Sequence, residues 1–315
     1  MSEPVVTLRG VRKKYGAVVA LERLDLDVRR GAVFGLLGPN GAGKSTTFGL
    51  VCGWLRADAG EARVLGVPSR EIHRLRGRVS ALPQDAAFPK NATVRRQLVH
   101  FGLLAGLTRA RAEDEAHRAL AAVGMSEAAE RKGGELSHGM LKRVGLAQAL
   151  VGEPELILLD EPTAGLDPAA ARQVKDLVGG LAPRATVVIS SHNLAEIQEV
   201  CSHGAILDHG RLVQAGSIGE LTRRGTEISI ELGEGPPPPL ARLRESFVAA
   251  SVEGRVLSLT CQAGEDVAAA IARALRALLD AGTPILGVRR GTSLEDAFLA
   301  ATGGAPPRAA ARQGS

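Results

Sequence analysis

The chain has 315 residues, of which 45% are hydrophobic and 23% are charged, so it is long enough for two domains and apolar enough to bury a core. Its net charge of +5 is spread along the chain and singles out no partner, and an aromatic share of 3% argues against stacking platforms for single-stranded nucleic acid. The chain begins without a secretory leader and has no apolar run of about 18 residues, which predicts a cytoplasmic location.

Predicted strands and helices alternate over about the first two thirds of the chain. Val5–Arg9 and Leu24–Val28 alternate apolar and polar residues, as half-buried strands do. Three short apolar runs are typical of buried strands: Ala32–Leu37, Leu156–Leu159 and Thr186–Ile189. A helix is predicted after Asp167, with Pro168 at its first position and an apolar stripe at Val174, Leu177, Val178 and Leu181. The pattern indicates an α/β domain with a mainly parallel sheet.

Two regions depart from this alternation. A helical subdomain, about residues 86–152, is predicted to interrupt the first domain. Near residue 221 the pattern changes again, where Ser217 and Glu220 form a candidate capping box before Leu221. We therefore expect the first domain to cover residues 4–221.

A small second domain is predicted for residues 226–302. It begins with a strand at Glu227–Leu232 and a helix at about Leu240–Ser246, followed by two strands around Glu253-Gly254. A second helix has apolar residues at Val267, Ile271, Leu275, Leu278 and Leu279, and a final strand comes before residue 290. The order β-α-β-β-α-β predicts a small α+β, ferredoxin-like fold. A short closing helix is expected at Leu294–Ala300, and residues 303–315 are expected to be a disordered tail.

The strongest chemical motif is a glycine-rich loop between a predicted strand and a predicted helix. Its residues are Gly38-Pro39-Asn40-Gly41-Ala42-Gly43-Lys44-Ser45, followed by Thr46. This spacing, G-x-x-x-x-G-K-[ST], lets backbone N–H groups surround phosphate oxygens at the positive end of a helix. Lys44 is expected to bridge the β- and γ-phosphates, and Ser45 to coordinate Mg²⁺.

Two adjacent carboxylates end the apolar strand at Leu156–Leu159. Asp160 is predicted to hold Mg²⁺, and Glu161 to face the attacking water, because side chains alternate along a strand. His192 follows the next buried strand and is a candidate partner of the γ-phosphate. With the glycine-rich loop, these residues predict a site of nucleotide hydrolysis.

The order and spacing of these motifs, over about residues 4–220, resemble the ATP-binding cassette (ABC) ATPase of a membrane transporter, a P-loop NTPase fold. Gln84 stands where this family has the glutamine of its Q-loop, and Tyr15 where an aromatic ring stacks on adenine. His192 fits the switch histidine, and Ala164–Asp167 resembles the D-loop. The resemblance implies that Gln84 senses Mg²⁺ or water and couples to a transport subunit. Residues Ala86–Phe101 would then form the docking surface.

The family's signature, Leu-Ser-Gly-Gly-Gln, corresponds to residues Leu136–Met140. His138 replaces the first glycine and Met140 the glutamine, while Ser137 and Gly139 remain at the start of a predicted helix over Leu141–Val151. The resemblance implies a head-to-tail dimer in which Ser137 and Gly139 contact the γ-phosphate held by the other subunit. The departures leave open whether they are subgroup variation or weaken the site, and whether the dimer is a homodimer or a heterodimer.

The leading interpretation is an Mg²⁺-ATP hydrolase that powers a separate integral membrane permease, with export expected from the resemblance of the second domain to the extra domain of two-component exporters. The ATPase would then lie peripherally on the inner face of the cell membrane. One alternative is a non-transport ABC ATPase of DNA repair or translation, which the single phosphate loop and modest charge disfavour, so no nucleic-acid partner is expected. The other is a regulatory ATP-binding subunit with weak hydrolysis.

Overall fold

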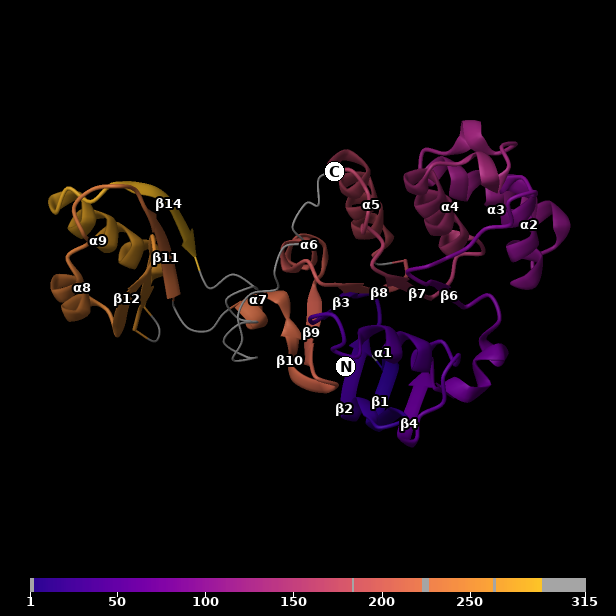
Figure 1. The fold of residues 1–315 in the computed structure, drawn as a ribbon, viewed down its shortest axis with the longest axis horizontal. Helices are drawn as coiled ribbons and strands as arrows, with labels where there is room; N and C mark the ends of the chain where they lie inside the picture. Colours follow the sequence, from indigo (N-terminus) through magenta and orange to yellow (C-terminus); the bar gives the residue numbers. More distant parts are fainter. Residues whose placement is uncertain (1–2, 183, 223–226, 263–264, 291–315) are drawn as a thin grey trace. The chain divides into compact units, whose positions relative to one another are not determined.

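The computed structural model describes residues 3–182, 184–222, 227–262 and 265–290 (Figure 1). The chain divides into two compact units, one running to Ala215 and one that starts at Gly216. The predicted closing helix Leu294–Ala300 and the predicted tail 303–315 lie outside the described residues. Within the described part of the chain, no helix is both long and apolar enough to cross a membrane.

The first unit is built on a six-stranded sheet in the order β10-β9-β3-β8-β7-β6. Its strands are β3 (Val33–Leu37), β6 (Val79–Leu82), β7 (Leu156–Asp160), β8 (Thr186–Ser191), β9 (His203–Asp208) and β10 (Arg211–Ser217). Every residue of β3, β7 and β8 is buried, and these three strands are parallel neighbours. Figure 1 shows α1 (Lys44–Val51) on one side of the sheet, and α5 (Pro168–Leu181) and α6 (Leu194–Val200) on the other. The three predicted apolar strands are confirmed.

A second, antiparallel sheet in the same unit was not predicted. Its order is β2-β1-β4-β5, with β1 at Pro4–Tyr15, β2 at Val18–Arg29, β4 at Ala59–Val64 and β5 at Val67–Pro68. The prediction of one mainly parallel sheet is therefore incomplete. The alternation in Val5–Arg9 and Leu24–Val28 already had the period of antiparallel strands with one buried face. Only alternate residues of β4, Ala62 and Val64, are buried, so its apolar signal is too short to be found in the sequence.

Three helices and short 3-10 turns make up the predicted helical region. The helices are α2 (Val94–Leu104), α3 (Arg109–Ala122) and α4 (His138–Leu150), and the turns are at Ser126–Ala128 and Gly133–Glu135. Each helix begins after a hydroxyl side chain that accepts a hydrogen bond from its first turn: Thr93, Thr108 and Ser137. The last predicted helix therefore starts three residues earlier than expected, because Ser137 caps it. Figure 1 shows α2, α3 and α4 together at one end of the unit.

The second unit has the six predicted elements in their predicted order. They are β11 (Glu227–Leu232), α8 (Leu240–Ser246), β12 (Ala249–Glu253), β13 (Val256–Thr260), α9 (Val267–Asp280) and β14 (Ile285–Arg290). The antiparallel sheet has the order β12-β13-β11-β14. Its core includes Ile228, Leu259 and Leu278. Of the five apolar residues that marked the second helix, Leu279 is 67% exposed. The capping box before α7 (Ile218–Thr222) is confirmed by reciprocal hydrogen bonds between Ser217 and Glu220.

Candidate functional site

The glycine-rich loop Gly38–Thr46 connects β3 with α1, as its motif requires. Gly41 and Gly43 have φ values of +84° and +101°, which L side chains rarely adopt. A Cβ atom on Gly43 would lie 2.7 Å from the carbonyl oxygen of Ala20. The loop is thus held against β2, and the N-cap residue of α1 is Gly43, which has no side chain to cap the first turn. Its backbone donors at that helix end suit an anion.

Lys44 lies at the base of this loop and is 6% exposed. Its Nζ donates to the carbonyl oxygens of Gly38 at 2.8 Å and Pro39 at 3.1 Å. Burial lowers the pKa of Lys44, and the charges of Glu161 and Asp160 oppose that shift. A buried ammonium that donates to two carbonyl oxygens suits a phosphate ligand. Ser45 is exposed, and Thr46 is half-buried.

Asp160 and Glu161 lie beside the glycine-rich loop because β3, β8 and β7 end at the same edge of the sheet. Leu37 is opposite Ser191, and Ser190 is opposite Asp160. Ligands of parallel sheets bind at this carboxyl edge. Asp160 is 7% exposed and accepts a hydrogen bond from Ser190 Oγ through Oδ1. The buried carboxylate is the type of oxygen ligand that Mg²⁺ takes together with phosphate oxygens.

Glu161 brings three predicted site residues together. Its Oε1 lies 3.0 Å from His192 Nδ1, and its Oε2 accepts from Gln84 Nε2 at 3.4 Å. The Glu161 side chain is 11% exposed and that of His192 is 53% exposed. Glu161 has a φ of +48°, an uncommon conformation that turns its side chain away from the strand pattern. A shielded carboxylate with one imidazole and one amide partner can accept a proton from a bound water.

Ser190 is a part of the site that sequence reasoning missed. It is completely buried, donates to Asp160, and accepts a hydrogen bond from the Glu161 backbone N at 3.0 Å. One hydroxyl therefore fixes both members of the carboxylate pair. The signal was present in Ser190-Ser191-His192, which ends the buried strand next to the one that carries Asp160.

Tyr15 lies at the end of β1, and it is 48% exposed. It pairs with Val18 across a tight hairpin, and Lys13 Nζ lies 5.6 Å from its ring centroid. The β2 strand of this hairpin also contacts the glycine-rich loop, through Ala20 and Gly43. The exposed ring is therefore available for stacking on the same side of the unit as the loop.

The signature residues Leu136–Met140 lie away from the phosphate loop of their own chain. Ser137 is exposed and caps α4, accepting from the Met140 backbone N at 3.3 Å. Figure 1 shows α4 with the other helices of the helical region, apart from α1. The His138 ring lies over Gly165, where a Cβ atom would be 3.0 Å from His138 Nε2. Within one chain, the predicted site residues Ser137 and Gly139 therefore lie apart from the phosphate loop and the other predicted site residues.

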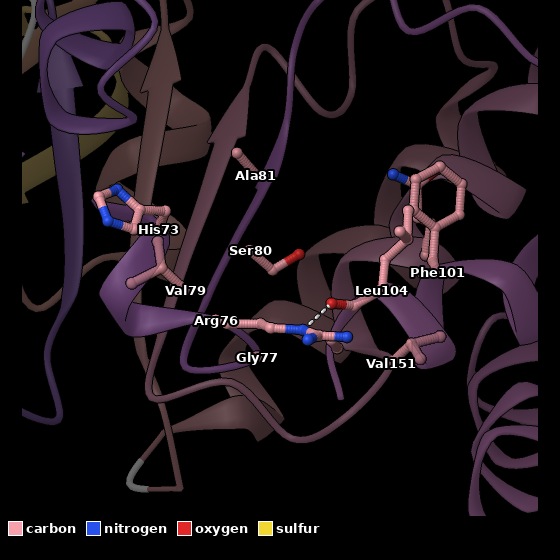
Figure 2. A pocket seen from close by; sticks show the side chains of 11 residues that line it. His73, Arg76, Gly77, Val79, Ser80, Ala81, Phe101, Leu104 and Val151 are labelled. Atoms are coloured by element: carbon pink, nitrogen blue, oxygen red, sulfur yellow. Dashed lines mark hydrogen bonds between the residues drawn. The ribbon is translucent and has the colours of Figure 1, made fainter. Parts of the chain in front are cut away.

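A cavity of about 420 Å³ opens between the sheet and the helical region (Figure 2). Its walls come from the segment before β6, from β6 itself, and from the ends of α2 and α4. Arg76 crosses this space and donates to the carbonyl oxygens of Leu103 and Leu104 at the end of α2. The dipole of α2 also stabilises a positive charge at this end of the helix. Phe101 lines the same cavity.

Comparisons with known proteins agree on one family. Residues 21–164 match the family model described as ABC transporter. The chain is 34% identical over 308 residues to the Nod factor export ATP-binding protein I of Rhizobium sp. (strain N33), covering 96% of this chain and 98% of that protein. It is 36% identical over 310 residues to the daunorubicin/doxorubicin resistance ATP-binding protein DrrA of Streptomyces peucetius, covering 93% and 91%.

Solved structures of the same family match about 70% of the chain. The ATP binding subunit of an ABC transporter matches with a TM-score of 0.64 and 25% identity, over 70% of this chain and 92% of that chain. The structure of cbiO1 from Clostridium perfringens, described as part of the ABC transporter complex cbiONQ, matches with a TM-score of 0.63 and 26% identity, over 71% and 92%.

Proposed function

The chain belongs to the ABC transporter family, as an ATP-binding subunit of the exporter type, and we propose that it hydrolyses Mg²⁺-ATP at the site around Lys44 and Glu161. The observation that carries this proposal is the meeting of Glu161, His192 and Gln84 at the edge of the sheet that also holds the phosphate loop. Relatives named for export or for drug resistance favour this function over a non-transport ATPase or a regulatory subunit.

Each side chain has a role that its surroundings support. The loop Gly38–Thr46 holds the phosphates, and Lys44 balances their negative charge. Ser45, Gln84 and Asp160 would provide oxygen ligands for Mg²⁺, and the bound metal would neutralise charge on the phosphates. Glu161 orients the attacking water and takes its proton, and His192 holds Glu161 on one side while facing the γ-phosphate on the other. Tyr15 stacks on adenine.

A second ATPase subunit completes the site. Ser137 and Gly139 stand at the N-terminus of a 13-residue helix, a site suited to an anion that lies apart from the phosphate loop of its own chain. In a head-to-tail dimer they contact the γ-phosphate held by the other subunit. A homodimer suffices, because one chain carries both halves of the site.

A membrane permease is the other partner, and it provides the translocation path. We place its contact on Ala86–Phe101 and on the adjoining cavity of Figure 2, where Phe101 and the exposed Leu104 offer apolar surface. The subunit then lies on the inner face of the membrane. Two relatives are named for export of, or resistance to, organic molecules, which supports export as the direction.

The proposed ATP-binding domain covers residues 4–221, with its helical subdomain at about 86–152. The six-element domain at 226–302 carries no cluster of three metal-binding side chains among its described residues, and we assign it a supporting role in assembly or regulation.

Hydrolysis by the purified full chain tests this function. The wild type should release phosphate from ATP only with Mg²⁺, and Glu161→Gln should abolish release while ATP binding persists. The matched control is Glu113→Gln on α3, whose carboxylate pairs with Arg109 far from the site. Loss of hydrolysis in the control, or hydrolysis that survives Glu161→Gln, would refute the assignment.

A further inference from the structure

The helix that carries the signature packs directly on the segment that delivers Gln84. A Cβ atom on Gly145 of α4 would lie 2.7 Å from Leu82 Cδ1 and 3.5 Å from Phe88 Cζ. Leu82 ends β6 and Phe88 lies four residues after Gln84. The absence of a side chain at Gly145 therefore lets α4 approach both sides of Gln84.

Lys142 makes a polar link at the same contact. It precedes Gly145 by three residues, so both face the same side of α4. Its Nζ donates to the Gln84 carbonyl oxygen at 2.9 Å. The Gln84 side chain in turn donates to Glu161 Oε2, and Glu161 Oε1 contacts His192. Two hydrogen bonds, one to the Gln84 main chain and one from its side chain, thus connect α4 with the Glu161 carboxylate.

The far end of the segment after Gln84 is also fixed. Gln97 of α2 donates to the carbonyl oxygens of Pro89 at 3.2 Å and Ala92 at 3.0 Å. The Gly134 backbone N donates to the Lys90 carbonyl oxygen at 3.0 Å. With its far end held, the position of the segment near Gln84 depends on the contact with α4.

We propose that Lys142 is a positioning residue for hydrolysis, which holds the Gln84 main chain so that the Gln84 amide meets Glu161. This inference rests on the proposed function, since it concerns the same site. Lys142 lies three residues after Gly139, which faces the partner's nucleotide in the proposed dimer. A shift of α4 when the partner's nucleotide binds would therefore move Gln84 and change the setting of Glu161 in the subunit that carries Lys142.

Hydrogen exchange of the nucleotide-free full chain tests the link itself. Lys142→Met keeps the length of the side chain and removes the donor, and Lys142→Arg keeps a donor. We expect Lys142→Met to speed exchange in peptides covering residues 83–93 about fivefold, the effect of about one hydrogen bond partly screened by water. Lys175→Met, which removes a lysine of α5 that donates to Glu199 of α6, should leave these peptides unchanged.

Steady-state kinetics then test the consequence for hydrolysis. Lys142→Met should lower kcat about fivefold while the affinity for a non-hydrolysable ATP analogue and the thermal midpoint stay as in wild type. Lys142→Arg should restore most of the rate, and Lys175→Met should behave as wild type. In a Gln84→Ala background, Lys142→Met should have no further effect, because Lys142 acts through Gln84.

Two results would overturn the inference while leaving the proposed function in place. One is a wild type that hydrolyses ATP and a Lys142→Met variant with equal exchange and equal kcat. The other is a Lys142→Met effect that multiplies with that of Gln84→Ala, since Lys142 would then act by another route. A wild-type chain without Mg²⁺-dependent hydrolysis would overturn the proposed function and this role together.

Discussion

Glu155 connects the starts of three strands of the six-stranded sheet through hydrogen bonds to two arginines. Removing its charge should lower the free energy of unfolding by a measurable amount. It lies just before β7, and its carboxylate accepts hydrogen bonds from Arg78, before β6, and from Arg30, before β3. These two guanidinium groups, with Arg78 the larger influence, lower the pKa of Glu155 from 4.5 to about 2. We therefore choose Glu155→Gln as the perturbation.

The size of the effect follows from this pKa. A difference of one pKa unit corresponds to about 1.4 kcal/mol, so the full linkage is about 3.4 kcal/mol. The Glu155 side chain is 34% exposed and both arginines are about half exposed, so solvent screening reduces this to about 1–2 kcal/mol. Because the pKa is lowered in the folded state, the stabilisation is complete above pH 4.5 and is lost as the pH falls toward 2.

Urea unfolding followed at Trp54 measures this difference. Trp54 is the chain's one tryptophan and lies in the unit that contains Glu155. Glu155→Gln should lower the free energy of unfolding by about 1–2 kcal/mol at pH 7, and the gap to wild type should narrow at pH 3.5. Glu130→Gln, in the exposed pair with Arg95, is the control and should change nothing measurable. A gap that is absent at pH 7, or that widens in acid, would refute the reasoning.

Three further variants test separate parts of the molecule. Lys44→Ala should lower hydrolysis by about 100-fold or more, because the buried ammonium that faces the phosphates is lost, and phosphate release measures it. Tyr15→Ala should raise the dissociation constant for ATP about fivefold while Tyr15→Phe should not, as calorimetry would show, and equal affinities would remove the stacking role. Asp167→Ala should lower the free energy of unfolding by about 1 kcal/mol, because Asp167 Oδ1 accepts a hydrogen bond from the Ala170 backbone N at the start of α5. Asp167→Asn keeps an acceptor and should leave the midpoint of thermal unfolding nearly unchanged.

The buried strands and their functional ends could be predicted because their signals are local. The apolar runs before Gly38 and Asp160 have the length and composition of buried strands, and each is followed by a motif whose chemistry depends on that position. The start of α5 could be predicted from equally local signals, the capping residue Asp167 and Pro168 at the first helical position.

Features that depend on contacts distant in sequence could not be predicted in this way. Ser190 is an ordinary strand residue until the pairing of β7 with β8 places it against Asp160. Lys142 is one of 39 lysines and arginines in the sequence, and its link to Gln84 depends on the close approach of α4 to β6 that Gly145 permits. Leu279 follows the apolar pattern of α9 in the sequence, but it lies at the border of the buried face of the helix and is exposed.

The composite site is the central claim, and the mass of the Glu161→Gln protein in solution tests it most directly. With Mg²⁺-ATP, light scattering on the full chain should show twice the mass of one chain, and the monomer mass should return when ATP is omitted. Adding Ser137→Arg to Glu161→Gln should prevent the dimer while ATP still binds, because Ser137 caps the helix that faces the partner's phosphate. A Glu161→Gln protein that is saturated with ATP and remains monomeric would contradict the claim.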